Sequence, residues 1–244
     1  KMIALLKVEW IKTKRTWITF VLSIGMPVFF FLFFSGMELS PDLKEQKVLV
    51  MSSMLTMTAF SMSSFGFFSF PAMLVEDKTS YWLTYIEHSS VSIWQYYLSK
   101  VIRVLVCFLL SILATFLFGA IFRGVTMPLS RWLGSATLLL LSSLLFLAFG
   151  LLISQMKSQQ LMTIVGDIAF LGLAIIGGSW MPIETFPEWM QKLAKVTPIY
   201  HVNILVTDFA KNAQLNWQSL IIVLGYAIII AALALMIKNK IEVK

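Results

Sequence analysis

Long apolar segments separated by short polar ones set the architecture that this sequence predicts. A helix needs about 20 mostly apolar residues to cross a bilayer. None of the long apolar segments shows the alternation of polar and apolar positions that is typical of a barrel strand, so we expect helices. We therefore predict an all-α integral membrane protein with a single transmembrane domain over residues 1–244. Its six predicted spans are 17–37, 48–75, 104–122, 132–154, 161–180 and 217–237.

The composition agrees with a membrane protein and the charge distribution suggests its orientation. Hydrophobic residues make up 59% of the 244 residues and charged residues only 13%, against about 45–50% and about 25% in soluble domains. The formal net charge of +7 arises mostly from segments 1–16, 76–103, 155–160 and 238–244. An even number of spans places these segments on one side, and positive residues mark the cytoplasmic side. We expect a multi-pass plasma membrane protein of a bacterium, with both termini in the cytoplasm, membrane lipids as neighbours and no nucleic-acid partner.

Residues 1–16 predict a helix that lies along the membrane surface. Met2, Ile3, Leu6, Trp10, Thr13 and Trp17 form one stripe of a helical wheel, whereas the basic side chains point elsewhere. Such a helix places lysines near anionic headgroups. The residues expected to act in this interface helix are Lys7, Trp10, Lys12 and Lys14. A simple cytoplasmic anchor for the first span is an equally open interpretation.

The sequence lacks the motifs of several enzyme classes. It contains no G-x-x-x-x-G-K-[ST] phosphate loop and no Gly-Lys dipeptide, so we expect no ATP hydrolysis by this chain. The two histidines are far apart, and no Cys/His cluster predicts a metal site. No nucleophile elbow supports a hydrolase. We expect a chain that is not an enzyme and binds no cofactor itself.

Polar residues inside the spans are candidates for a substrate path. The second span is rich in Ser, Met and Phe, and the fifth carries an acid. A charge at the membrane centre costs about 2.5–3.5 kcal/mol and normally faces a bundle interior or water. The candidates for a path or a gate are Ser61, Ser64, Phe67 and Asp167. A structural role is also open, because helix serines can bond their own backbone and the acid can bond a neighbouring helix or subunit.

Two polar motifs interrupt the apolar pattern. The first, GGSWMPIETFPEWMQKLAKVTPIYH over 177–201, predicts short re-entrant helices within an extracellular region at 181–216. Prolines there are placed to begin helices, and tryptophans suit the headgroup layer. Its candidate residues are Gly178, Pro182, Pro187, Trp189, Pro198 and Tyr200. The second motif, VEDKTSYWLTYIEHSSVS over 75–92, gathers charges and aromatics on the predicted cytoplasmic side.

These two motifs, the amphipathic start and the order of six spans resemble the type-2 permease family of ATP-binding cassette (ABC) exporters. That family follows its fifth span with a Gly and a Pro, then an "lP-x-w-l-q" segment and "P-x-y", which 178–200 resembles. Its link between the second and third spans runs from an acid through Gly-Thr and Pro-x-Ser to a Lys. Here Glu76 and Lys100 match, while Ser80 and Ser90 stand near the places of the usual Gly and Pro.

The resemblance implies partners and a function. It implies pairing with a second permease, identical or different, and with two cytoplasmic ABC ATPase subunits that bind ATP and magnesium. It also implies that a cytoplasmic coupling helix in region 76–100 docks on the ATPase. The residues implied as coupling contacts are Glu76, Asp77, Lys78, Thr79, Tyr81, Trp82, Tyr85, Glu87 and His88. Simple anchoring at the membrane surface is the alternative role for them.

The expected cargo is amphiphilic or lipophilic: a small molecule, an antimicrobial peptide or a lipid-like compound. Short outer loops leave no large extracellular domain that could capture a polymer. A lipid-linked polysaccharide exporter, a membrane interaction or immunity protein without transport, and a secondary carrier remain alternatives.

Overall fold

The computed structural model describes residues 2–37 and 41–242, and within these ranges the regular structure is helical with no strand. Six helices in the described ranges are long and apolar enough to cross a membrane. The prediction of an all-helical, six-span protein is therefore confirmed. The spans are α2 (Trp17–Phe34), a continuous helix over Leu43–Thr79, α6 (Ile93–Arg123), α7 (Leu129–Ile153), α8 (Gln159–Ile176) and α11 (Trp217–Glu242).

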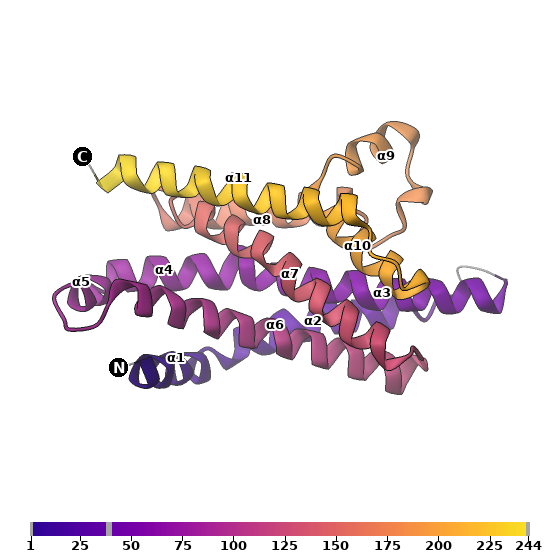
Figure 1. Ribbon diagram of the computed structural model, residues 1–244, viewed down its shortest axis with the longest axis horizontal. Coiled ribbons are helices and arrows are strands. Elements are labelled where there is room, and N and C mark those ends of the chain that lie inside the picture. The colour runs from indigo at the N-terminus through magenta and orange to yellow at the C-terminus, as the bar shows by residue number, and fades with distance from the viewer. Residues whose placement is uncertain (1, 38–40, 243–244) are drawn as a thin grey trace.

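The shorter helices lie at the two ends of the bundle. Helices α1 (Met2–Arg15) and α5 (Trp82–Glu87) lie at the end where α11 finishes, whereas α9 (Glu188–Ala194) lies at the opposite end (Figure 1). Both ends of the described chain are thus on one side. Besides α9, the region between the last two spans contains a 3₁₀ turn, η2 (Ile183–Thr185), and α10 (Pro198–Asn212).

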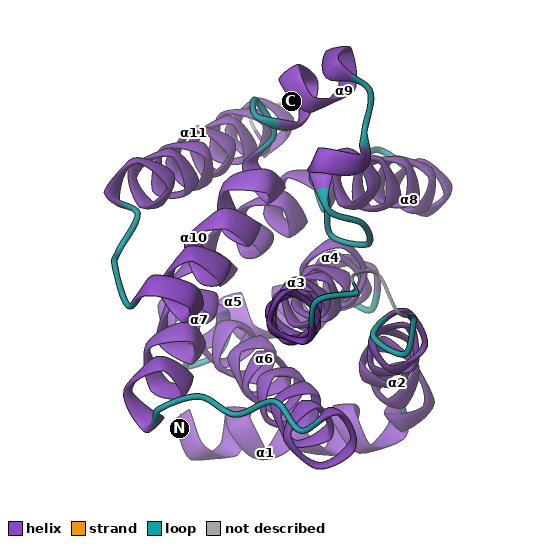
Figure 2. Cartoon of the chain, turned by 90° about the vertical axis from the view of Figure 1, so that its right-hand side faces the viewer, coloured by secondary structure: helices purple, strands orange, loops and turns teal. Residues whose placement is uncertain are grey.

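The second span is the centre of the bundle. It consists of α3 (Leu43–Ser64), a π-helical segment η1 (Phe65–Ser69) and α4 (Phe70–Thr79). Figure 2 shows α3 and α4 surrounded by the other spans. Met54, Leu55 and Met62 are fully buried. Because lipid tails are as apolar as these side chains, close packing and interhelical hydrogen bonds hold such a bundle together.

The π-helical segment immediately precedes Pro71. Proline has no N–H to donate and its ring crowds the carbonyl four residues earlier, here that of Phe67. The backbone responds with a wider turn, in which the N–H of Phe70 donates to the carbonyl of Phe65. The central span is therefore irregular at one defined level, between α3 and α4.

Two glycines allow the central span and α7 to touch at this level. A Cβ atom on Gly66 would lie 2.6 Å from Cβ of Phe146, and one on Gly150 would overlap the carbonyl oxygen of Gly66. Such close contacts between small residues are typical of membrane helices. In the fifth span, a Cβ atom on Gly166 would lie 3.3 Å from the Phe68 ring, whereas the space beside Gly172 is open.

Helix α10 packs between α3, α7 and α11, so it is more deeply embedded than the short surface helices expected from the sequence. Val202, Leu205 and Val206 are fully buried. Pro198 begins the helix, and the hydroxyl of Thr197 accepts from the Tyr200 N–H at 3.4 Å. Whether α9 and α10 re-enter the membrane stays a prediction.

Candidate functional site

Five charged side chains form an alternating chain between three helices at the end that carries α1 and α5. Lys12 Nζ lies 2.6 Å from Asp77 Oδ1, and Asp77 Oδ2 lies 2.5 Å from Lys100 Nζ. The same Lys100 ammonium is 2.6 Å from Glu9 Oε1. Arg103 completes the chain, with Nη1 donating to Glu9 Oε2 at 3.0 Å. We call these five side chains the charge chain.

Helical spacing explains how the charge chain assembles. Glu9 and Lys12 are three residues apart on α1, and Lys100 and Arg103 are three apart on α6, so each pair shares one helix face. Asp77 comes from the last turns of α4. The charge chain therefore joins α1 to the ends of the second and third spans.

The centre of the charge chain is removed from solvent. Lys100 and Asp77 are fully buried and Glu9 is 4% exposed. The Tyr96 hydroxyl donates to Asp77 Oδ2 at 2.9 Å, which satisfies a further acceptor of that carboxylate. Burying an ion costs several kcal/mol unless close partners compensate it. The charge chain therefore favours one arrangement of α1, α4 and α6 over others that would separate its members.

Helix α5 is held against this charge chain. Ile86 of α5, Leu5 of α1 and Tyr96 of α6 form a small apolar core. Lys12 also lies 5.7 Å from the ring centre of Trp82, close enough for a cation–π contact. Tyr81, in the left-handed region with φ of 57°, makes the turn between α4 and α5. The short helix thus has a defined position despite its length.

The outer side of α5 and of the preceding turn is exposed. Tyr81 is 76% exposed and Tyr85 is 66% exposed, with the Tyr85 ring stacked on Trp82. Aromatic residues are enriched in protein–protein interfaces. We call the exposed set the α5 face; it comprises Glu76, Lys78, Thr79, Tyr81, Tyr85, Glu87 and His88.

Two residues predicted as coupling contacts lie apart from the α5 face. Asp77 points inward to Lys12 and Lys100, and its side chain is fully buried. Trp82 is half-buried beneath Lys12. Both residues therefore hold the α5 face in position: Asp77 through its ion pairs, and Trp82 through its contacts with Lys12 and Tyr85.

Three of the residues predicted for a substrate path are buried in the bundle. Ser61 is buried in α3, where its hydroxyl contacts the Ser23 carbonyl at 2.9 Å and the Ser111 hydroxyl at 3.2 Å. Phe67 is buried and stacks on Phe149. The Ser64 hydroxyl donates to its own helix, at the Ser61 carbonyl. Ser61 and Phe67 thus join helices of this chain, whereas Ser64 bonds within its own helix.

Asp167 has different surroundings. Its side chain is exposed on α8, and the structure gives it no hydrogen bond or ion pair with the described residues. Ile164, Ile168 and Leu171 are exposed around it. A carboxyl group on an apolar helix face is unusual in a membrane span.

The other predicted residues occupy both ends of the bundle. On α1, Lys7, Trp10 and Lys14 are exposed, while Lys12 joins the charge chain. At the opposite end Gly178 adopts a φ of +72°, which favours glycine. The prolines there flank or begin helices and Trp189 is exposed: Pro182 precedes η2, Pro187 precedes α9 and Pro198 opens α10, whose Tyr200 is half-buried.

Sequence reasoning missed Glu9, Tyr96 and Arg103 as members of this site, and it named Lys100 only as a match to the family pattern. The available signal was the pair of three-residue spacings, Glu9 to Lys12 and Lys100 to Arg103. Pairing between segments so distant in sequence could not be assigned without knowing that α1 folds back along α6.

The fold defines a multi-pass membrane protein, and the comparisons with known proteins define its family. The family model described as ABC-2 family transporter protein matches residues 37–237. The chain therefore belongs to the ABC-2 transporter family, as a permease subunit. This membership confirms the resemblance drawn from the two polar motifs, and it implies association with ABC ATPase subunits.

Two curated relatives carry names that agree with this family. The chain is 27% identical to "Putative transport permease YvfS" of Bacillus subtilis over 220 residues, which cover 90% of this chain and 89% of that protein. It is 30% identical to "Probable multidrug ABC transporter permease YbhR" of Escherichia coli over 141 residues. The second match covers 54% of this chain and 37% of the relative. Both relatives are named as membrane components rather than ATPases.

Proposed function

We propose that this permease works in an ATP-driven exporter and that the α5 face is where an ATPase subunit docks. The observation that carries the proposal is an exposed, aromatic and charged surface mounted on a buried charge chain. Tyr81 and Tyr85 are exposed, while Asp77 and Lys100 directly behind them are fully buried and paired. An exposed contact surface that is held in place by buried ion pairs is suited to bind another protein and to transmit its movement.

The connections of the charge chain suggest how a push on α5 reaches the membrane. Asp77 belongs to α4, which continues into the central span, and Lys100 belongs to α6. A displacement of α5 would act on both helices through the buried ion pair of Asp77 and Lys100. Separating this pair is unfavourable, because each buried charge would be left without its partner. ATP-driven closure of the ATPase pair would thus tilt the second and third spans together.

The partners in this proposal follow from the family. We propose a second permease subunit, identical or different, and two cytoplasmic ATPase subunits that bind ATP and magnesium. The groups of His, Cys, Asp and Glu in the described ranges include none that could hold a metal ion. The end with α1 and α5 would face the cytoplasm at the plasma membrane, in agreement with its basic residues.

The cargo that fits best is an amphiphilic or lipophilic molecule moved outward. The relative YbhR is named as a probable multidrug transporter permease. The short outer loops in the sequence of this chain form no large extracellular domain that could capture a polymer. Lipophilic drugs and membrane-active peptides partition into the bilayer and can reach a permease from within it.

Everted membrane vesicles containing the permease and its ATPase subunits test function and direction together. Export from a cell becomes uptake into an everted vesicle, so addition of ATP and magnesium should drive accumulation of a lipophilic fluorescent cation. Vesicles with an ATPase whose catalytic glutamate is replaced provide the control. ATP-driven loss of dye from everted vesicles would contradict export, and dye movement independent of the ATPase would contradict the whole proposal.

A further inference from the structure

A second feature of the α1 end lies on the side of the charge chain that faces the bilayer. Helix α1, the turn into α2 and the outer side of α6 enclose a groove of about 400 Å³, a volume in the range of ligand pockets. We call it the α1–α6 groove. Its walls are mostly apolar, with Leu6, Trp10 and Trp17 on one side and Ile102, Val106 and Leu110 on the other.

Basic and aromatic groups stand at one end of the α1–α6 groove. Lys14 and Arg103 line it, and Lys14 Nζ lies 5.5 Å from the ring centre of Trp10. Trp10 and Trp17 are 55% and 59% exposed, as is typical of indoles at the membrane–water interface. The carboxylate that also lines the groove, Glu9, is already compensated by Lys100 and Arg103. The local charge available to a ligand is therefore positive.

The other end of the groove opens onto lipid-facing surface. From Arg103 to Leu110, α6 rises about 10 Å, and beyond this point Leu113 and Leu117 continue the exposed apolar face. A polar, positively charged end followed by an apolar channel along a span matches one kind of membrane molecule. We propose that the α1–α6 groove binds an anionic phospholipid, with its phosphate at Lys14 and Arg103 and an acyl chain along Val106 and Leu110.

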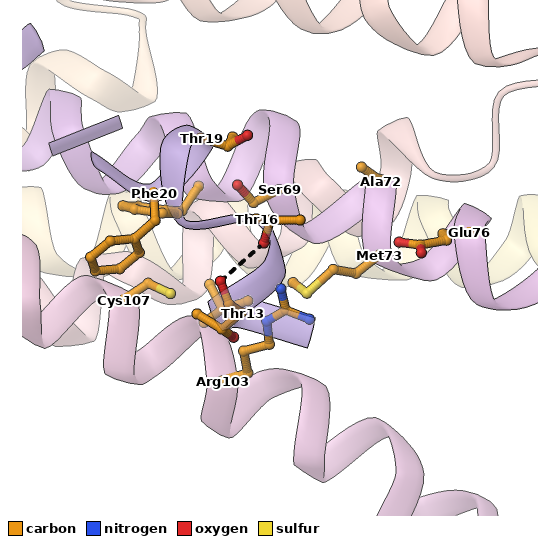
Figure 3. Close-up of a pocket in the computed structure, with 12 residues that line it drawn as sticks. Thr13, Thr16, Thr19, Phe20, Ser69, Ala72, Met73, Glu76, Arg103 and Cys107 are labelled. Atoms are coloured by element: carbon orange, nitrogen blue, oxygen red, sulfur yellow. Dashed lines mark hydrogen bonds between the residues drawn. The ribbon is translucent and has the colours of Figure 1, made fainter. Parts of the chain in front are cut away.

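A neighbouring cavity shares Arg103 with the groove but differs from it in the other polar groups that line it. On the other side of the turn between α1 and α2, a cavity of about 180 Å³ is drawn in Figure 3. Hydroxyls of Thr13, Thr16 and Ser69 line it together with the carboxylate of Glu76. Arg103 lines that cavity as well (Figure 3), but there it is accompanied by hydroxyls and an acid and not by Lys14, so the cavity is less suited to a phosphate than the groove is.

Arg103 connects the proposed lipid site to the charge chain. Its guanidinium has five N–H donors, and one nitrogen donates to Glu9 at 3.0 Å. A phosphate at the remaining donors would share the guanidinium with Glu9 and fix the position of α1 relative to α6. The charge of the surrounding lipid would then influence how firmly α1 is held.

Native mass spectrometry of the permease tests the lipid site directly. The protein is taken from nanodiscs that contain phosphatidylglycerol and phosphatidylcholine in equal amounts, and the retained lipid is identified on the intact chain. We expect retention of phosphatidylglycerol over phosphatidylcholine. Lys14→Gln should lower phosphatidylglycerol retention about fivefold, the effect of one basic residue near an anionic surface. Arg15→Gln, which removes the same charge from a neighbouring position outside the groove, should leave retention unchanged.

A steric pair makes the test independent of charge. Val106 and Leu109 are similarly exposed on α6, at 41% and 43%, but only Val106 lines the groove. Val106→Trp should abolish selective retention and Leu109→Trp should not. Equal retention of the two lipids, or equal loss in both members of either pair, would overturn the proposal. Displacement of the retained lipid by soluble glycerol phosphate would also overturn it, because a headgroup alone would then suffice. If Val106→Trp fails to fold, the lysine and arginine pair decides alone.

Discussion

Lys100 of the third span and Asp77 of the second span form an ion pair of 2.5 Å although both side chains are fully buried. The two helices are connected by the very segment that carries the α5 face. The ion pair therefore holds together the two helices at the ends of the connecting segment, while the middle of that segment, the α5 face, is exposed. Glu9 and Lys12 attach α1 to the same pair of helices, since Lys12 pairs with Asp77 and Glu9 pairs with Lys100.

Replacing Lys100 should destabilise the protein strongly. Lys100→Met leaves Asp77 and Glu9 buried without their shared cation, and breaking a buried pair costs about 3–5 kcal/mol. Lys78→Met removes the same charge from an exposed neighbour of Asp77 and should change stability by about 0.5 kcal/mol or less. Thermal unfolding in detergent compares the two variants. Similar unfolding temperatures would show that the buried pair does not hold these helices.

The contact between Gly66 and Gly150 should tolerate no side chain. Gly66→Ala places a Cβ against Phe146, and overpacking of a close contact typically costs about 1–3 kcal/mol. Gly172→Ala is the matched control, since the space around that helical glycine is open and alanine favours a helix by about 1 kcal/mol. We expect a lower unfolding temperature for Gly66→Ala alone. A neutral Gly66→Ala variant would contradict the close approach of the central span and α7.

Asp167 should matter for assembly or transport rather than for the fold of one chain. It is exposed on α8 and has no partner among the described residues. Asp167→Asn removes its charge with little change in shape, so the unfolding temperature of the isolated permease should stay the same. Transport by the assembled complex should fall several-fold if the carboxyl group meets a second subunit or the cargo. If both transport and assembly stayed unchanged, Asp167 would have no role in either and would be only a solvated or lipid-exposed side chain.

His201 predicts a loss of stability in acid at the opposite end of the bundle. Its Nε2–H donates to the Lys195 carbonyl at 3.0 Å, and Nδ1 lies 3.3 Å from the Ser219 hydroxyl. Burial lowers the pKa of His201 below its ordinary value of 6.5, despite the opposing hydrogen bond to Lys195. The stability from the neutral imidazole is therefore complete above about pH 6.5 and is lost as the pH falls through the lower, folded-state pKa.

The His201→Gln variant isolates this effect, because glutamine does not titrate. Between pH 7.5 and pH 5 the unfolding temperature of the wild type should fall further than that of His201→Gln. Carboxylates elsewhere in the chain contribute equally to both proteins and cancel in the comparison. A parallel fall in the two proteins would show that His201 does not titrate in this range.

The long-range order of the spans followed from sequence because it rests on simple physics. An apolar segment such as 132–154 has to cross the membrane, and its length is set by the bilayer. The start of the third span was harder to predict: α6 begins at Ile93 and carries the buried Lys100 and the half-buried Arg103 near its start. Hydropathy assigns such charges to a loop, since their partners come from another helix.

The site was predictable only in part for the same reason. The aromatic and charged residues of 76–88 mark an unusual segment in the sequence itself. Which of them faces outward depends on α1, because Lys12 and Glu9 draw Asp77 and Lys100 inward. Of the expected apolar stripe of α1, Leu6, Trp10 and Trp17 line the α1–α6 groove, and Ile3 is 83% exposed. Pairing across 65 residues of sequence, from Lys12 to Asp77, is a property of the folded chain.

Site-specific photocrosslinking from the α5 face tests the central claim most directly. A photoreactive phenylalanine derivative replaces Tyr85, which is 66% exposed at the α5 end, or Trp189, which is 67% exposed at the opposite end. Both variants are assembled with the ATPase subunits, and crosslinked products are identified by mass spectrometry. We predict a crosslink from position 85 to the ATPase and none from position 189. An ATPase crosslink from position 189, or none from position 85 in an active complex, would contradict this prediction.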